Sequence, residues 1–80
     1  MRSDTRRLCV QGLPETIEAA VLNALFTQFP GFREVRLIEA RPGIAFVEYE
    51  SEPQAGAALA GLQAFKVDED HTMQITYAKR

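Results

Sequence analysis

The ten residues RPGIAFVEYE, numbers 41–50, have the pattern of a half-buried β-strand. Successive side chains of a strand point to opposite faces, so every second residue shares a face. One face suits a hydrophobic core and consists of Ala45, Val47 and Tyr49. The other face places an aromatic ring between an aliphatic chain and a charge, and consists of Ile44, Phe46 and Glu48. The stretch therefore predicts a strand with one covered face, and it leaves open whether Phe46 on the other face is displayed to a ligand or packs under a tail or loop.

The residues before this strand predict a strand, a helix and another strand. LCVQGL, numbers 8–13, alternates apolar with small or polar residues. A helix follows with Thr16 placed as its cap, and Pro30 ends it. Its apolar stripe comprises Val21, Leu22, Leu25, Phe26 and Phe29. Residues 32–38 alternate again, and a tight connection joins them to the strand quoted above, which predicts a hairpin.

The residues after it predict a second helix and a last strand. Ser51 and Gln54 have the spacing of a capping box at the start of the Ala-rich helix PQAGAALAGL. A short extended piece around Phe65 and Val67 leads into an acidic run at 68–70. The last strand, MQITY, buries Met73, Ile75 and Tyr77 by alternation and exposes Gln74 and Thr76.

The expected order is βαββαβ, the ferredoxin-like plan of the α+β class. Two right-handed crossovers place both helices on one face of a four-stranded antiparallel sheet with the spatial order 4-1-3-2. The other sheet face is left open, and Phe46 points to it.

Length and composition narrow the class of protein. Eighty residues suffice for one domain, which we expect at 7–80 after an N-terminal tail at 1–6. No apolar run is long enough for a membrane span. The single cysteine, Cys9, forms no internal disulfide, and with His71 it is too little for a metal cluster, so we expect neither metal nor cofactor. The net charge of −2 is unusual for a nucleic-acid binder, so the positions of the charged residues are more informative than their sum.

The predicted fold brings residues of candidate function together. The first and third strands are neighbours, so Cys9 and Gln11 adjoin the open face of the quoted strand. Aromatic rings on an open sheet stack unpaired bases. The start of the first strand lies beside the end of the last one, so Arg6 and Arg7 should approach Lys79 and Arg80. Such a basic patch attracts phosphates.

Two stretches resemble signatures of a known family. PGIAFVEY, 42–49, is similar to the third-strand signature of RNA recognition motifs, with Pro42 and Ile44 as its departures. LCVQGL resembles their first-strand signature, although the family usually has an aromatic at the place of Cys9 and often Asn at that of Gly12. Three longer stretches resemble one subfamily more narrowly, the C-terminal RNA recognition motif of the spliceosomal U1 small nuclear ribonucleoprotein A and U2 small nuclear ribonucleoprotein B″ family. These stretches are LFTQFPGFREVRLI, QAGAALAGLQAFKV and MQITYAK.

The resemblance implies an RNA-binding module of a splicing-associated small nuclear ribonucleoprotein in the nucleus. Single-stranded RNA and spliceosomal proteins are the implied partners, and the chain is expected to be a monomeric domain of a longer protein. The candidate RNA contacts are Cys9, Gln11, Arg36, Arg41, Ile44, Phe46, Glu48, Gln74, Thr76, Lys79 and Arg80. Of about three aromatic platform positions, Phe46 alone remains, so we expect weak or auxiliary binding.

Two other functions compete with this one. A protein-interaction domain would use the sheet face, with Ile38, Ile44 and Phe46 as an apolar patch, or the helix surface. A small ferredoxin-like enzyme such as an acyl phosphatase would need a glycine-rich phosphate loop, paired carboxylates or a nucleophile next to a base. The sequence shows none of these, so we expect no enzymatic activity.

Overall fold

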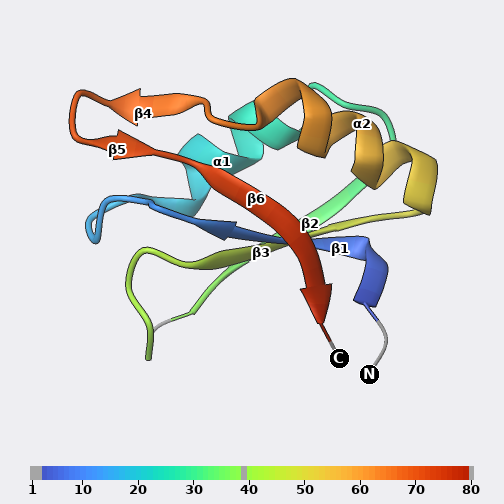
Figure 1. Ribbon diagram of the computed structural model, residues 1–80, viewed down its shortest axis with the longest axis horizontal. Helices are drawn as coiled ribbons and strands as arrows, with labels where there is room; N and C mark the ends of the chain where they lie inside the picture. The colour runs from blue at the N-terminus through green and yellow to red at the C-terminus, as the bar shows by residue number, and fades with distance from the viewer. Residues whose placement is uncertain (1–2, 39, 80) are drawn as a thin grey trace.

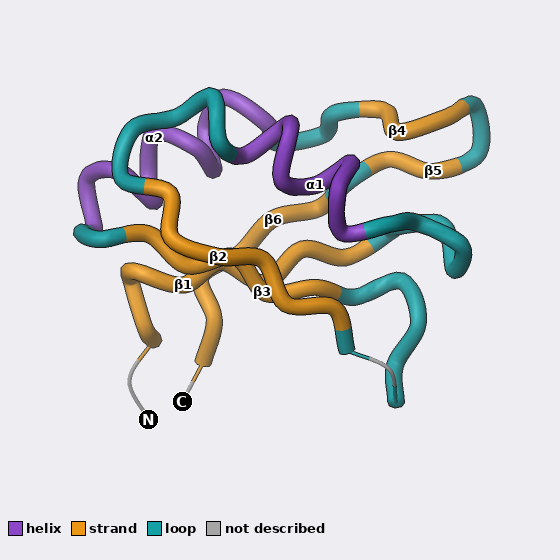
Figure 2. Tube along the Cα trace, turned by 180° about the vertical axis from the view of Figure 1, so that it is seen from behind, coloured by secondary structure: helices purple, strands orange, loops and turns teal. Residues whose placement is uncertain are grey.

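The computed structural model describes residues 3–38 and 40–79 (Figure 1). Its main sheet has four antiparallel strands: β1 (Ser3–Gln11), β2 (Phe32–Leu37), β3 (Ala45–Tyr49) and β6 (Gln74–Lys79). Their spatial order is β2-β3-β1-β6, which confirms the predicted order with β6 as the fourth strand. The helices α1 (Ala19–Phe26) and α2 (Glu52–Leu62) lie on one side of the sheet, and the side below it in Figure 1 carries no helix. Figure 2 shows the same two layers from behind.

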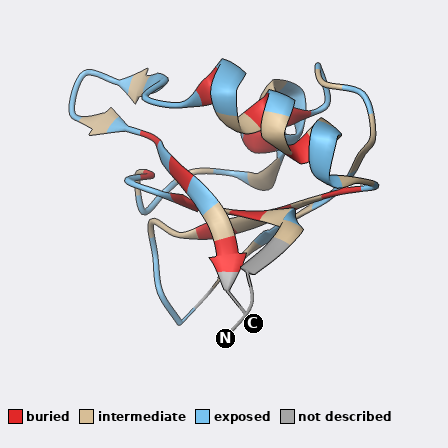
Figure 3. Ribbon diagram, turned by 45° about the vertical axis from the view of Figure 1, so that its right-hand side comes forward, coloured by how far each residue is buried: buried red, intermediate tan, exposed pale blue. Residues whose placement is uncertain are grey.

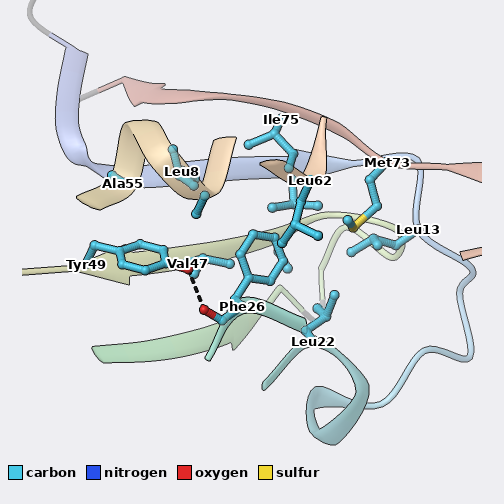
Figure 4. Packing of buried hydrophobic residues seen from close by; sticks show 13 residues of the cluster. Leu8, Leu13, Leu22, Phe26, Val47, Tyr49, Ala55, Leu62, Met73 and Ile75 are labelled. Atoms are coloured by element: carbon cyan, nitrogen blue, oxygen red, sulfur yellow. Dashed lines mark hydrogen bonds between the residues drawn. The ribbon is translucent and has the colours of Figure 1, made fainter. Parts of the chain in front are cut away.

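The core lies between the sheet and the two helices (Figures 3 and 4). Alternation in β3 places Ala45, Val47 and Tyr49 in it, each at most 1% exposed, as predicted. Helix α2 contacts the sheet through small residues, so its backbone approaches the strands closely. The helices contribute Leu22 and Phe26 from α1, and Ala55, Ala58 and Leu62 from α2.

The Tyr49 hydroxyl joins the sheet to helix α1. It donates a hydrogen bond of 2.6 Å to the carbonyl oxygen of Phe26, as Figure 4 shows. The ring of Phe32 packs edge-on against Tyr49 with 6.0 Å between the ring centroids. Burial disfavours the charged phenolate and raises the pKa of Tyr49 from 10.0 to about 12.

This pKa predicts a loss of stability in alkali that depends on Tyr49. Below pH 10 the phenol is neutral in both states, whereas between pH 10 and 12 the unfolded chain loses a proton that the folded chain keeps. The free energy of unfolding should therefore fall by about 1.4 kcal/mol per pH unit in that range. Urea unfolding of wild type and Tyr49→Phe from pH 8 to 12 measures this fall. An equal fall in both proteins would contradict the prediction, since they share every other titratable group.

Both helix starts differ in detail from the expected caps. Thr16 does not cap α1: the N-cap is Glu18, and no side chain caps the helix. Ile17 N–H instead donates to the Pro14 carbonyl at 3.1 Å, so a turn occupies this segment and delays the helix. Ser51 is the N-cap of α2 as predicted, but its hydroxyl donates to Gln54 Oε1 at 3.0 Å and does not bond the helix backbone.

Strand β1 begins earlier than its apolar pattern indicates. Its backbone pairs Ser3 with Lys79 and Asp4 with Ala78, so the strand includes residues 3–6, which the sequence assigned to a tail. The register is irregular between Asp4 and Leu8. The start of β1 thus lies beside the end of β6, as expected.

Near the start of β6, the segment that precedes it bonds to the outer edge of the strand. Gln63 Nε2 donates to the Ile75 carbonyl at 2.7 Å, and Ile75 N–H donates to Gln63 Oε1 at 2.9 Å. The side-chain amide of Gln63 therefore replaces a neighbouring strand at this residue. Met73 is bonded in turn to the backbone of Ala64 and Phe65. The strands β4 (Lys66–Asp68) and β5 (His71–Thr72) then form a small separate hairpin, where the sequence indicated only an extended piece and a loop.

Candidate nucleic-acid interface

One row of side chains crosses all four strands on the open face of the sheet. Phe46 of β3 lies opposite Arg36 of β2 on one side and opposite Cys9 of β1 on the other. Cys9 in turn lies opposite Thr76 of β6. The next position along β1 and β6 pairs Gln11 with Gln74. The structure thus assembles most of the predicted contacts, namely Cys9, Gln11, Arg36, Phe46, Gln74 and Thr76.

Phe46 is half-buried at the centre of this face, and the guanidinium of Arg7 contributes to its burial. The Arg7 Cζ atom lies 5.1 Å from the ring centroid, within the range of a cation–π contact. The sequence missed this role, because Arg7 was assigned to a basic patch near the chain ends. Period-two alternation backwards from Gln11 and Cys9 would have placed Arg7 on the open face.

A shallow hollow lies beside Phe46 and is lined by Cys9, Gln11, Phe46, Thr76 and Tyr77. Cys9 stands at the position where a second ring would narrow this space. Gln11 Nε2 approaches the Cys9 sulfur at 3.7 Å. The hollow offers amide and hydroxyl groups beside the ring, which can hydrogen-bond to the edge of a base.

The charged side chains at the β2 side of the open face form two ion pairs. Arg33 Nε lies 3.5 Å from Glu48 Oε2, and Arg36 Nη2 lies 3.3 Å from Glu34 Oε2. Because these side chains are largely exposed, each pair contributes little to stability. With Arg7, three arginines face two glutamates, so the open face has a local excess of positive charge although the whole chain is acidic.

Two of the remaining predicted contacts, Arg41 and Ile44, lie away from this row. Arg41 is exposed in the β2–β3 connection. Ile44 lines a separate half-open pocket of about 190 Å³ between that connection and the segment before α1, together with Glu15, Ile17, Leu37, Ile38, Pro42 and Gly43. Ile38 and Ile44 therefore share a surface, whereas Phe46 belongs to the neighbouring hollow. Lys79 is described only as the backbone partner of Ser3, and Arg80 lies outside the described residues.

The acidic run at 68–70 lies at the hairpin of β4 and β5, at the opposite end of β6 from the chain termini (Figure 1). Asp68 Oδ1 lies 2.8 Å from His71 Nδ1 and accepts the Asp70 N–H at 2.9 Å. The hydrogen bond with His71, and then that from Asp70, lower the pKa of the Asp68 carboxyl. These interactions bind the carboxylate within its own hairpin.

Within the described ranges, no group of three or more His, Cys, Asp or Glu side chains is arranged to hold a metal ion. No helix in the described part of the chain has the length and apolar character needed to cross a membrane.

The family model described as RNA recognition motif matches residues 8–73, which fall within the expected domain at 7–80. The chain belongs to the RNA recognition motif family. Members of this family are binding modules, in agreement with the expectation that the chain is not an enzyme.

Curated relatives narrow this assignment. This RNA recognition motif is 52% identical over 73 residues to the U2 small nuclear ribonucleoprotein B″ of Oryza sativa subsp. indica, covering 91% of this chain and 32% of the relative. It is 49% identical over 73 residues to the U1 small nuclear ribonucleoprotein A of Drosophila melanogaster, covering 91% of this chain and 34% of the relative. The chain thus spans about a third of the length of these relatives.

Solved structures agree on the fold. The second RNA recognition motif domain of yeast poly(U)-binding protein (Pub1) superposes with a TM-score of 0.79 at 20% identity, covering 92% of this chain and 94% of that one. The RNA recognition motif domain of S. pombe Puf1 superposes with a TM-score of 0.78 at 28% identity, covering 92% of this chain and 97% of that one. At such identities the likeness concerns the ferredoxin-like arrangement of strands and helices.

Proposed function

We propose that the chain is the RNA-binding module of a splicing-associated small nuclear ribonucleoprotein, that it acts in the nucleus, and that it binds single-stranded RNA on its open sheet face. The observation that carries the proposal is the row of Arg36, Phe46, Cys9 and Thr76 across four neighbouring strands. It combines a stacking ring, a cation and a hydroxyl on a face without a helix. The relatives named above, both small nuclear ribonucleoproteins, support the cellular setting.

We further propose that binding is weak or auxiliary. Among the described residues, Phe46 is the aromatic side chain of the open face, since Phe26, Phe29, Phe32, Tyr49 and Tyr77 all lie in or against the core. Phe65 is exposed, but it lies just before β4. Each stacked base contributes about 1–3 kcal/mol, so a platform without two of three rings loses roughly 2–6 kcal/mol. We expect a Kd on the order of 10⁻⁴ M or weaker.

A titration of single-stranded RNA into isotope-labelled protein tests the proposal through the amide chemical shifts. The amides of Phe46, Gln11 and Gln74 should move in a dose-dependent way, whereas amides of the α1 surface such as Asn23 should stay in place. If the open-face amides stay fixed at millimolar RNA, this face is not an RNA site and the proposal fails.

A protein contact is the second candidate function, favoured by the pocket at Ile38 and Ile44. Its apolar lining and its volume of about 190 Å³ suit one aliphatic or aromatic side chain of a spliceosomal partner. A pull-down with Phe46→Ala separates the two candidates. If Phe46→Ala still binds the partner but no longer binds RNA, the partner docks away from Phe46. If the variant loses both, the partner docks on the sheet face.

A further inference from the structure

The guanidinium of Arg7 lies over the ring of Phe46. This cation–π contact lies at the centre of the open face. The register places Arg7 opposite Glu48 on β3, so Phe46 is its diagonal neighbour. The Glu48 carboxylate is engaged by Arg33 at 3.5 Å. The guanidinium of Arg7 is accordingly directed at a ring although a carboxylate stands opposite it in the sheet.

We propose that Arg7 clamps the base that stacks on Phe46, so that the base lies between the Phe46 ring and the Arg7 guanidinium. This inference rests on the proposed function and deepens it. Nucleic acid bases stack on aromatic rings and also on the planar guanidinium of arginine. Because Cys9 has no flat π-face, Arg7 supplies the second stacking plane that the first strand otherwise lacks.

The observed position of Arg7 differs from this arrangement by one short movement. A base between two planes needs two van der Waals contact distances of about 3.5 Å, roughly 7 Å in all. The Arg7 Cζ atom lies 5.1 Å from the Phe46 centroid, so it must withdraw by about 2 Å. A long arginine side chain achieves this by rotamer changes without a movement of β1. In the structure the guanidinium lies over the ring, and in the proposed arrangement it lies over the base.

Arginine and lysine differ in the property that the clamp needs. Both carry one positive charge, but only the guanidinium is flat enough to stack over a base. The variant Arg7→Lys therefore keeps attraction to phosphates and removes the stacking plane. Arg33→Lys makes the same chemical change on the same sheet at a residue that contacts Glu48 and no ring, so it serves as the matched control.

The experiment compares two probes at low salt: a fluorescein-labelled uridine octamer, and an octamer with the same sugar-phosphate chain and label but without bases. The ratio of their affinities measures the contribution of the bases alone. For Arg7→Lys we expect this ratio to fall about tenfold relative to wild type, with the affinity for the baseless chain unchanged. For Arg33→Lys we expect the wild-type ratio.

Two other results would overturn the clamp. If Arg7→Lys retains the wild-type ratio, Arg7 does not touch the base. If that unchanged ratio comes with an equal loss of affinity for both probes, Arg7 contacts phosphate only, and if the ratio rises, Arg7 obstructs the ring. Failure of the proposed function is recognised separately, because wild type itself would then bind both probes equally well or bind neither.

Discussion

Replacing Gly12 by asparagine is expected to lower the free energy of unfolding by about 2–4 kcal/mol. Gly12 follows β1 with φ of +81°, a left-handed conformation that asparagine accepts better than most residues. The space is the larger obstacle, because a Cβ atom on Gly12 would collide with the carbonyl oxygen of Thr72 in β5. Because the colliding atom belongs to the backbone of β5 and not to a flexible side chain, the β4–β5 hairpin has to move. Urea unfolding of both proteins measures the difference.

Gly43→Asn is the matched control for this prediction. Gly43 has φ of +89°, so the substitution meets the same backbone conformation, but its Cβ would lie 3.0 Å from the Leu13 carbonyl oxygen, which a small shift relieves. We expect a loss of about 1 kcal/mol there. Equal losses in the two variants would show that the Thr72 carbonyl moves away freely. The comparison of Gly12→Asn with Gly43→Asn also tests how closely this chain packs its hairpin onto the end of β1.

Replacing Phe46 by alanine is expected to weaken binding of single-stranded RNA about 5-fold to over 100-fold, the equivalent of one stacked base at about 1–3 kcal/mol. The ring is half-buried on the side of the sheet opposite the core, so the fold should be retained. Fluorescence anisotropy with the uridine octamer measures the affinity, and thermal unfolding measures the fold.

Phe46→Tyr and Phe46→Leu distinguish stacking from simple apolar contact. Tyrosine keeps a π-face and should retain affinity within a few-fold, whereas leucine keeps apolar area and should bind like alanine. A leucine variant with wild-type affinity would contradict stacking at this position. A tyrosine variant as weak as alanine would show that the ring edge, and not its face, meets the RNA.

Much of this fold was predictable because its strands alternate strongly. Ala45, Val47 and Tyr49 identified the covered face of β3, and the same period put Phe46 on the open one. The order of elements then fixed which strands are neighbours, so the row through Cys9, Phe46 and Thr76 followed from topology.

The parts that were missed depend on contacts that a local pattern does not contain. Arg7 was read as part of a basic patch, because two adjacent arginines interrupt the apolar alternation before Leu8. Pairing with the end of β6 nevertheless extends β1 through them. The β4–β5 hairpin has strands of three and two residues, which tertiary hydrogen bonds from Met73 to Ala64 and Phe65 hold in place. Helix α1 begins later than predicted because a turn at Ile17 precedes it.

The hydrogen bonds between the Gln63 side chain and Ile75 affect the tendency of the molecule to aggregate in concentrated solution. An unprotected sheet border recruits strands from other molecules and seeds aggregates. Here the peptide groups of Ile75 are already saturated from within the chain, and the opposite border, β2, presents Arg33, Glu34 and Arg36. The bonded peptide groups of Ile75 and the charged side chains of β2 therefore disfavour edge-to-edge pairing of sheets between molecules at high concentration.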